Sequence, residues 1–409
     1  MPGTRPGMTQ KQATPSGTKT PMLFSRDRIL TTHVGSLPRN ETLSDLLVRQ
    51  EAGEKFDARD MADEMDKAVR HVVEKQASAG IDIGNDGEQQ RVGFQTYVPQ
   101  RMSGFAGVSK RRRGREFEEF PALMESLKRR FPHVSKQQNA PECQSELKYL
   151  DLKPIESEIA RFKKISGGKF AEGFMTAPSP GIISSTMLDA FYGSHDKYLS
   201  AIAREMKNEY QAIHKAGLLL QIDAPDLAMD RTMMFRDLDE KGFVKTVERG
   251  VAAINDGIAS IPRDRVRLHV CYGNWEGPHI HDVPLAAILP ALYQANVGAL
   301  SIEFSNPRHA HEYSALKTHP LPKDMLLIPG VVETTSNFVE HPEVVARRIE
   351  DAVAAVGDRE RVIASTDCGF GTFTNREWVI EPAVWLKLRS IREGADIASR
   401  RLWGKKSVA

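Results

Sequence analysis

Cysteine is scarce in this sequence. Among 409 residues there are three, Cys143, Cys271 and Cys368. Three thiols cannot build a disulfide framework, because any pairing leaves one of them over. We therefore expect free thiols or metal ligands at these positions.

Long apolar runs and an excess of one charge are also missing. No stretch of about 18 apolar residues occurs, and the first residues do not resemble a signal peptide, so we expect no membrane span and a cytoplasmic location. The formal net charge is only +2, whereas domains that bind nucleic acid are strongly basic. With 40% hydrophobic and 27% charged residues, the chain is predicted to be globular, with neither nucleic acid nor membrane as a partner.

Eight short apolar runs that end in polar residues or glycine alternate with longer segments of helical period. Strands with apolar middles between helices predict a parallel sheet, and eight such units predict an α/β fold of the (β/α)8 TIM barrel type. A doubly wound open sheet is the alternative. The predicted strands are residues 29–36, 80–88, 169–179, 217–225, 266–274, 298–304, 325–332 and 361–369.

Two segments fall outside this alternation. Residues 1–22 are rich in Pro, Gly, Thr and Lys and are predicted to be a disordered lead-in. Residues 23–409 are predicted to be one barrel domain, with a charged helical insertion at about 100–168, between the second and third strands, as a cap or side subdomain. For the basic run SKRRRGRE, residues 109–116, we expect a solvated turn, with a site for an anionic substrate or partner as the alternative.

Polar side chains collect where the predicted strands end, and a TIM barrel carries its active site at that rim. His269 and Cys271 are two apart on one strand, so their side chains point to the same side. Glu303 and Cys368 follow two other strands at the same rim. One nitrogen, two sulfurs and one oxygen suit Zn²⁺ better than Mg²⁺ or Ca²⁺. We predict a zinc site of these four residues, from which Glu303, the weakest ligand, yields to substrate.

A series of motifs follows the strands in order: TTHVGSLPR, DGEQQR, QIDAP, HVCYGN, SIEFSNPR, IPGVV and TDCGFGT. Together they resemble the catalytic C-terminal domain of cobalamin-independent methionine synthase, over about residues 27–395. The resemblance implies a TIM barrel with the same four zinc ligands and a substrate thiolate bound to the zinc. It also implies that Glu88 and Asp223 hold the amino group of a homocysteine-like thiol, and that the segment of Gly35 and Ser36 holds its carboxylate.

The sequence departs from this family at two places that concern the alkyl donor. A histidine that follows the seventh strand in the family is replaced by Thr335, with Glu333 in place of the family's aspartate. A tryptophan of the third strand, which stacks on the pterin in the family, is replaced by Pro180 or a neighbour. Both changes argue against methylfolate as the donor.

The loss of that histidine leaves the general acid open. A group that protonates the leaving atom contributes roughly 10²- to 10⁴-fold to the rate. The candidates are Glu333, His279 and His281, with His33 from the first strand. Asp367 either orients its neighbour Cys368 or moves protons, and Asp282 is expected to cap the helix that follows it.

The sequence therefore predicts a zinc-dependent transferase that moves a methyl or other alkyl group to the sulfur of a small thiol through a zinc-bound thiolate. One alternative is the addition of coenzyme M to an epoxide, for which Arg39, Arg91 or Arg308 would hold the sulfonate. Others are a zinc-free lyase related to uroporphyrinogen decarboxylase and a zinc-stabilised barrel that binds a ligand without chemistry. A homodimer is possible.

Overall fold

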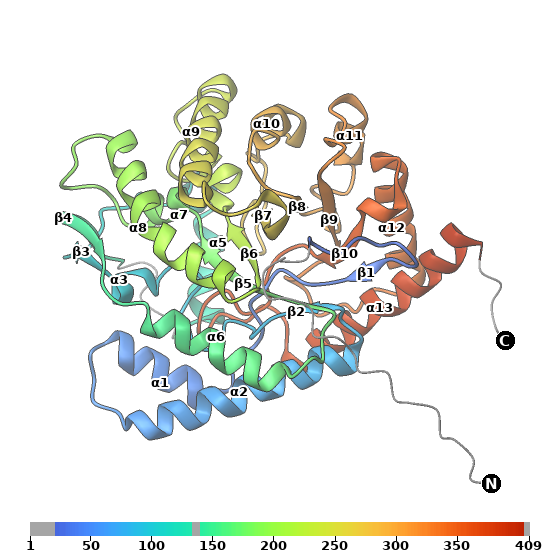
Figure 1. Ribbon diagram of the computed structural model, residues 1–409. Helices are drawn as coiled ribbons and strands as arrows, with labels where there is room; N and C mark the ends of the chain where they lie inside the picture. Colours follow the sequence, from blue (N-terminus) through green and yellow to red (C-terminus); the bar gives the residue numbers. More distant parts are fainter. Residues whose placement is uncertain (1–20, 133–139, 405–409) are drawn as a thin grey trace, which may run out of the picture.

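The computed structural model describes residues 21–132 and 140–404. Within them, eight parallel strands lie side by side in the order β1-β10-β9-β8-β7-β6-β5-β2, surrounded by helices (Figure 1). The two ends of this sheet meet, because the Asp82 amide donates to the Thr31 carbonyl at 3.1 Å and the Thr32 hydroxyl donates to the Ile83 carbonyl at 2.8 Å. The (β/α)8 barrel is thus confirmed over the open sheet. The strands are β1 (Leu30–Thr31), β2 (Ile83–Gly84), β5 (Glu172–Pro178), β6 (Leu219–Asp223), β7 (Val266–Val270), β8 (Ala299–Ile302), β9 (Leu326–Val332) and β10 (Ile363–Thr366).

At least one helix lies in each connection between consecutive strands. Several helices begin at a side chain that satisfies an otherwise free backbone amide; Asp57 accepts from the Arg59 amide and Ser194 from the Lys197 amide. The barrel helices are α1 (Glu41–Glu51), α2 (Ala58–Ala79), α6 (Lys153–Ser166), α7 (Pro180–Thr186), α8 (His195–Lys215), α9 (Glu240–Ile258), α10 (Leu285–Leu292), α11 (Ala315–Thr318), α12 (Pro342–Val356) and α13 (Glu381–Trp403). One-turn 3₁₀ helices lie at Pro225–Leu227, Met229–Arg231, Arg263–Arg265, Glu312–Ser314 and Arg359–Arg361.

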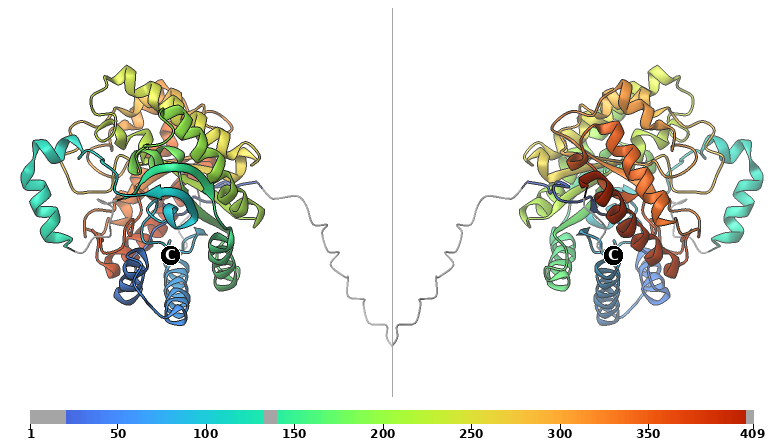
Figure 2. Two further views of the ribbon diagram at one scale, coloured as in Figure 1. Left: turned by 90° about the vertical axis from the view of Figure 1, so that its left-hand side faces the viewer. Right: turned by 90° about the vertical axis from the view of Figure 1, so that its right-hand side faces the viewer.

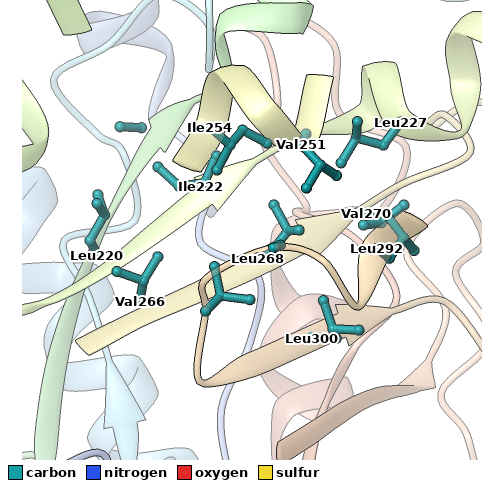
Figure 3. Packing of buried hydrophobic residues seen from close by; sticks show 14 of the residues in the cluster. Leu220, Ile222, Leu227, Val251, Ile254, Val266, Leu268, Val270, Leu292 and Leu300 are labelled. Carbon is teal, nitrogen blue, oxygen red and sulfur yellow. The ribbon is translucent and has the colours of Figure 1, made fainter. Parts of the chain in front are cut away.

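The main hydrophobic core lies between the strands and the helices that cover them. Leu220 and Ile222 of β6 and Leu268 of β7 point outward, where they meet Val251 and Ile254 of α9 (Figure 3). All five side chains are buried. Burial of one such side chain stabilises the fold by roughly 1.5–3 kcal/mol, so this layer fixes the strands that carry the site.

The inside of the barrel changes from apolar to polar along its axis. One end is filled by Phe174, Leu219, Ile328 and their buried neighbours. Next to them the Arg267 guanidinium lies over the Phe174 ring, 3.9 Å from its centroid, and donates to the Gln221 side chain at 2.6 Å. Burial lowers the pKa of Arg267 to about 9. This polar layer supports the residues at the carboxyl ends of the strands.

The ordered chain begins earlier than the sequence predicts. Residues 1–20 of the expected disordered lead-in lie outside the described residues. Met22, which was expected to belong to that lead-in, is instead buried. Its amide donates to the Asp264 carbonyl at 3.1 Å, and its side chain packs with the apolar residues inside the barrel. Burial of Met22 at the apolar end of the barrel stabilises this segment more than its local sequence favours disorder.

The segment predicted as an insertion has two parts. Its last helix, α6, packs against α2 and α8 and takes the place of the barrel helix between β2 and β5. The described remainder contains α3 (Val98–Arg101), α4 (Arg115–Glu119), α5 (Pro121–Arg130) and an antiparallel pair that the sequence analysis missed, β3 (Met102–Ala106) with β4 (Glu142–Tyr149). Figure 2 shows its helical part, in teal, at one side of the barrel.

A buried cluster of charges ties this segment to the barrel. Arg91 and Arg101 both donate to the Glu158 carboxylate on α6, and Arg101 also lies 3.2 Å from the Glu209 carboxylate on α8. Tyr97 donates to Glu209 at 2.5 Å. Removal of one partner from such a cluster leaves an uncompensated buried charge, so the base of the insertion is held firmly.

None of the described helices is long and apolar enough to span a lipid bilayer.

The core described above makes a direct prediction for stability. Ile254→Ala is expected to lower the free energy of unfolding by about 2–5 kcal/mol, because it leaves a cavity between α9 and the strands. Leu386→Ala on α13, whose side chain is 51% exposed, is the control and should change it by less than about 0.5 kcal/mol. Denaturant unfolding measures both, and equal effects would contradict this packing.

Candidate functional site

A cavity of about 420 Å³ opens where the strands of the barrel end. Its wall combines residues from the strand ends with residues from the insertion. The strand ends contribute the residues that the sequence analysis singled out, and the insertion contributes cations and apolar side chains. The lining includes Ser36, Glu88, Asp223, His269, Cys271, Cys368, Arg111, Arg112, Arg113, Lys128, Phe94, Phe117, Phe131, Phe373, Trp275 and Arg376.

His269 is held in this wall by Asp223. The two residues are register partners on the parallel strands β6 and β7, so their side chains project side by side. Nδ1 of His269 lies 3.0 Å from Oδ1 of Asp223. Because a carboxylate only accepts, Nδ1 carries a proton, and Nε2 is the ring nitrogen that is left for a metal when the imidazole is neutral. Nε2 is buried and has no hydrogen-bond partner in the described part of the chain.

Two thiols complete a cluster around this nitrogen. The sulfurs of Cys271 and Cys368 are 3.5 Å apart, and the ligand atoms of His269, Cys271 and Cys368 all lie within 4.8 Å of one another. The Gly273 amide donates to the Cys271 sulfur at 3.2 Å, and hydrogen bonding to Cys368 together with burial raises the pKa of Cys271 well above its usual value. A free imidazole nitrogen beside two sulfurs fits Zn²⁺.

Glu303, predicted as the fourth ligand, is not a member of this group among the described residues. Its carboxylate accepts hydrogen bonds from the Tyr272 amide at 2.9 Å, from Asn306 at 2.9 Å and from Arg308 at 3.1 Å. Ligation by Glu303 therefore stays a prediction. Within the described structure its Oε1 accepts only the Tyr272 bond and keeps an acceptor site.

The residues predicted to bind the thiol's amine and carboxylate lie together beside this cluster. Gly35 has φ +146°, and a Cβ there would lie 2.7 Å from Thr176 Cγ2 and 3.0 Å from Glu88 Oε1, so only glycine allows this approach. Ser36 lies against Gly369, the neighbour of Cys368, where an added Cβ would be 2.0 Å from the Ser36 hydroxyl. Ser36, Glu88 and Asp223 all line the cavity. The pairing of Asp223 with His269 was not part of the sequence prediction.

One carboxylate oxygen of Glu88 is buried without a hydrogen-bond partner in the described part of the chain. Oε1 accepts from the Thr176 hydroxyl at 2.8 Å, but the buried Oε2 has no hydrogen-bond partner within residues 21–132 and 140–404. Burial and the charge of Asp223 raise the pKa of Glu88 to about 7, against the charges of Arg91 and Arg39. A positively charged ligand in the cavity would satisfy both carboxylates.

Glu333 was predicted to move protons, but it is not among the described residues that line the cavity. It accepts from the amides of Thr335 at 2.8 Å and Ser336 at 2.9 Å, and Lys387 lies 3.3 Å away. Although burial acts in the opposite direction, Ser336 and Lys387 lower the pKa of Glu333. In this structure Glu333 closes the turn after β9, so its role as an acid stays a prediction.

Asp367, the other predicted carboxylic acid of the site, also lies outside the described cavity wall. It accepts from the backbone amides of Phe304, Ser305 and Asn306 at 3.0, 2.9 and 3.0 Å. These bonds shape the turn that follows β8 and carries Glu303. Both roles that the sequence left open for Asp367, orientation of a zinc ligand and proton transfer, stay predictions.

His279 and His281, in the loop after β7, are not among the described residues that line the cavity. The His279 ring stacks on Trp275 with 4.3 Å between centroids, and its Nδ1 lies 3.2 Å from Asp282. His281 lies 2.6 Å from Glu119 of α4. Both histidines hold the loop in place, Trp275 among its residues, and their roles as general acids stay predictions.

Two smaller expectations are resolved by long-range contacts. Asp282 does not cap α10 as expected; the Leu285 amide donates instead to Glu312, at 2.7 Å, because Asp282 is engaged by His279 and by His309 at 3.1 Å. His33 is buried beside Gln76, 2.8 Å away, and burial lowers its pKa to about 4. It lies outside the described cavity wall.

The sequence analysis missed most of the aromatic and cationic wall. Phe94 and Phe373 come from loops, Phe117 lies on α4 and Phe131 follows α5, so these rings share no sequence pattern. Trp275 was within reach of the analysis, since it follows the HVCYGN motif directly. It provides an indole ring in the cavity of a chain that lacks the tryptophan of the family's third strand.

Fold and site together define a TIM-barrel protein with a histidine–dicysteine cluster at the carboxyl ends of its strands. The chain belongs to the family described as "Cobalamin-independent synthase, Catalytic domain", whose profile matches residues 29–123 and 160–393. The stretch left unmatched between them, residues 124–159, falls in the insertion. The resemblance to cobalamin-independent methionine synthase is thereby confirmed.

Similar proteins cover nearly the whole chain. The methionine synthase of Sulfurisphaera tokodaii is 23% identical, with 92% of this chain and 94% of the relative covered. The uncharacterized protein YxjH of Bacillus subtilis is 24% identical, with 90% and 93% covered. Among solved structures, a B12-independent methionine synthase from Shewanella sp. W3-18-1, in complex with selenomethionine, superposes with a TM-score of 0.68 at 19% identity, with 92% and 99% covered. That likeness supports the barrel fold.

The environment of Glu88 leads to a prediction about its titration. The Glu88 carboxyl should titrate near pH 7, and Asp223→Asn should lower its pKa because a like charge is removed. Carbon-13 NMR of labelled glutamate side chains measures both values, with Glu88→Gln to assign the signal. Titration in the ordinary range of an exposed glutamate would contradict the arrangement, as would a pKa unmoved in Asp223→Asn.

Proposed function

We propose that the protein transfers a methyl or other alkyl group to the sulfur of a small, amine-bearing thiol similar to homocysteine, in a zinc-dependent reaction. One observation carries this proposal. The same cavity holds a histidine–dicysteine cluster with an unpartnered nitrogen and a buried carboxylate, Glu88, with an unpartnered oxygen. The cluster suits a metal that binds the thiol, and the Glu88 carboxylate suits an ammonium group. A thiol that carries an amine would therefore bind at both places.

The zinc would be held by His269, Cys271 and Cys368, with Glu303 as the predicted fourth ligand. When bound, zinc keeps a substrate thiol in its deprotonated form, which is the nucleophilic one. The reaction forms a bond from the substrate sulfur to the alkyl carbon and breaks the bond from that carbon to its leaving atom. The thiol proton balances the negative charge that the leaving group acquires.

The side chains of the cavity position the thiol for this step. Glu88 Oε2 and the carboxylate of Asp223 would accept from the ammonium group, and the Ser36 segment would receive the carboxylate. Asp223 would serve twice, because its Oδ1 also orients His269. Such orienting partners typically change metal affinity by 10- to 100-fold when they are removed.

The alternatives fit this cavity less well. A sulfonate-bearing thiol would leave the unpartnered Glu88 oxygen without a cationic partner. The three arginines that the sequence analysis named for the sulfonate are engaged by other groups and do not line the described cavity, although other arginines do. Arg39 donates to the Glu88 and Gly371 carbonyls, Arg91 to Glu158, and Arg308 to Glu303. A zinc-free lyase would not use the histidine–dicysteine cluster. The family assignment agrees with the transferase.

Metal content tests the proposed cluster. The purified protein should hold about one zinc per chain, Cys271→Ser should lose it, and Asp223→Asn should bind it roughly 10- to 100-fold more weakly. Elemental analysis and competition with a chelator measure these values.

The third cysteine provides the control for this test. Cys143 is buried on β4 and does not line the described cavity, so Cys143→Ser should keep its zinc. Protein without zinc, or equal zinc in the Cys271→Ser and Cys143→Ser variants, would refute the metal site.

Thiol binding tests the roles of Glu88 and Asp223. Homocysteine should bind the zinc-loaded protein more tightly than 4-mercaptobutyrate, which is the same molecule without the amine. Glu88→Gln should weaken homocysteine binding roughly 10- to 100-fold, because a charged hydrogen bond is lost, and leave 4-mercaptobutyrate unchanged. Calorimetric titration measures the affinities.

The same experiment predicts a pH dependence. Protonation of Glu88 removes the charge that attracts the ammonium group, so homocysteine affinity should fall as the pH drops through about 7. The wild-type protein should show this fall relative to Glu88→Gln. Equal affinities for the two thiols, or a pH profile unchanged in Glu88→Gln, would contradict the assignment.

A further inference from the structure

The backbone at Glu88 is strained and firmly held. Its φ is +55°, a left-handed conformation that residues other than glycine adopt only at a cost. The Glu88 amide donates to the Asp86 carboxylate at 3.0 Å, and its carbonyl accepts from the Arg39 guanidinium at 2.6 Å and from the Arg91 amide at 3.1 Å. Strain of this kind persists where the surroundings fix it, often at ligand sites. The turn after β2 therefore places this one side chain with precision.

The carboxylate of Glu88 is held by the hydroxyl of Thr176 on β5. The Thr176 oxygen lies 2.8 Å from Glu88 Oε1 and 3.0 Å from Nη1 of Arg91. A guanidinium can only donate, so the hydroxyl oxygen accepts from Arg91 and its single hydrogen is directed at Glu88. The same Nη1 donates to the Thr176 carbonyl at 2.9 Å. The order of donors and acceptors is thus fixed along these three residues.

Arg91 is anchored on its other side by α6. Its Nε and Nη2 donate to Oε2 of Glu158 at 3.2 and 2.9 Å. Glu158, Arg91 and Thr176 are all buried, and charge-assisted hydrogen bonds in such surroundings are strong. We refer to Glu158, Arg91 and Thr176 as the Glu88 support. It runs from a barrel helix to the wall of the cavity.

The two oxygens of Glu88 have different surroundings. Oε1 is enclosed, because a Cβ at Gly35 would lie 3.0 Å from it and 2.7 Å from Thr176 Cγ2. Oε2 has no hydrogen-bond partner in the described part of the chain, and Glu88 lines the cavity. Thr176 is not among the described lining residues. Thr176 can therefore affect a ligand in the cavity only through Glu88.

Other cations line the same cavity. The basic run of residues 109–116 was expected to form a solvated turn, but its Arg111, Arg112 and Arg113 belong to the cavity wall, and the barrel contributes Arg376. None of them occupies Oε2 of Glu88, which has no partner within residues 21–132 and 140–404. These cations therefore leave that oxygen free for a ligand.

We propose that Thr176 is a positioning residue for the thiol substrate: its hydroxyl, directed by Arg91, holds Glu88 with Oε2 turned toward the substrate's ammonium group. The ammonium group in this inference rests on the proposed function, whereas the orientation of Glu88 rests on the contacts of the Glu88 support alone.

The same hydroxyl favours the charged form of Glu88. A hydrogen bond donated to a carboxylate stabilises the ionised state. Burial and the charge of Asp223 raise the pKa of Glu88 to about 7, while Arg91, the Thr176 hydroxyl and Arg39 act in the opposite direction. Without the hydroxyl, a larger share of Glu88 would be protonated near pH 7, and its attraction for an ammonium group would weaken.

Thr176→Val tests this role, because valine has nearly the same shape and no hydroxyl. In the zinc-loaded protein, homocysteine affinity at pH 7 should fall roughly tenfold, the effect of one hydrogen bond to a charged group. The loss should shrink toward pH 8.5, where Glu88 is ionised more fully in both proteins. Binding of 4-mercaptobutyrate should not change. Calorimetric titration at several pH values measures these affinities.

Further variants separate positioning from a merely structural role. Thr176→Ser should restore homocysteine affinity, and Thr176→Ala should behave like Thr176→Val. Thr374→Val is the matched control, since the buried Thr374 hydroxyl donates to the Val92 carbonyl at 2.8 Å and lies outside the described lining. In a Glu88→Gln background, Thr176→Val should have no further effect. An equal loss in that background, or a pH profile unchanged by Thr176→Val, would overturn the proposal.

Titration of Glu88 without any thiol separates this proposal from the proposed function. Carbon-13 NMR should show a higher pKa for Glu88 in Thr176→Val than in the wild type or Thr374→Val. If the pKa rises but the wild type binds homocysteine no better than 4-mercaptobutyrate, the proposed substrate is wrong and the orientation of Glu88 stands. If homocysteine binding depends on Glu88 but Thr176→Val changes neither pKa nor affinity, the positioning role is wrong and the proposed function stands.

Discussion

The hydrogen bond between Asp223 and His269 is the interaction on which the site depends. It joins register partners of adjacent parallel strands, so it is built into the barrel rather than into a loop. It fixes the proton on Nδ1 and turns Nε2 toward Cys271 and Cys368. The side-chain amide of Gln221 donates to the same Asp223 oxygen at 2.7 Å. Gln221 in turn accepts a hydrogen bond from the buried Arg267. The polar interior of the barrel therefore serves to orient one imidazole.

The rest of the cavity is organised around this fixed point by two different parts of the chain. The barrel supplies the cluster and the carboxylates at its strand ends. The insertion supplies the opposite wall, with its cations and apolar side chains, and is locked to the barrel through the buried charges around Glu158. It also reaches the loop after β7, where Glu116 accepts from the Ile280 amide at 2.6 Å. The wall of the cavity is therefore built by two parts of the chain, the barrel and the insertion.

The features that could be predicted from the sequence are those that depend on residues close together in the chain. All eight barrel strands were found, because buried parallel strands are short apolar runs. The pairing of His269 with Cys271 on one side of a strand followed from the alternation of side chains. The partner of His269 was not found as such, because it depends on strand register. The contacts of Glu312 and Met22 join segments far apart in the chain, which no local pattern records. The departures from expectation are therefore concentrated in the insertion, the loops and the ends.

The central claim is that His269, Cys271 and Cys368 hold a zinc to which the substrate thiol is brought. X-ray absorption at the zinc edge, recorded on the purified protein with and without homocysteine, tests it most directly. The account predicts a spectrum with two sulfurs and at least one nitrogen around the metal, and one additional sulfur after homocysteine is added. A metal surrounded only by nitrogen and oxygen, or a sulfur count that homocysteine does not change, would contradict it.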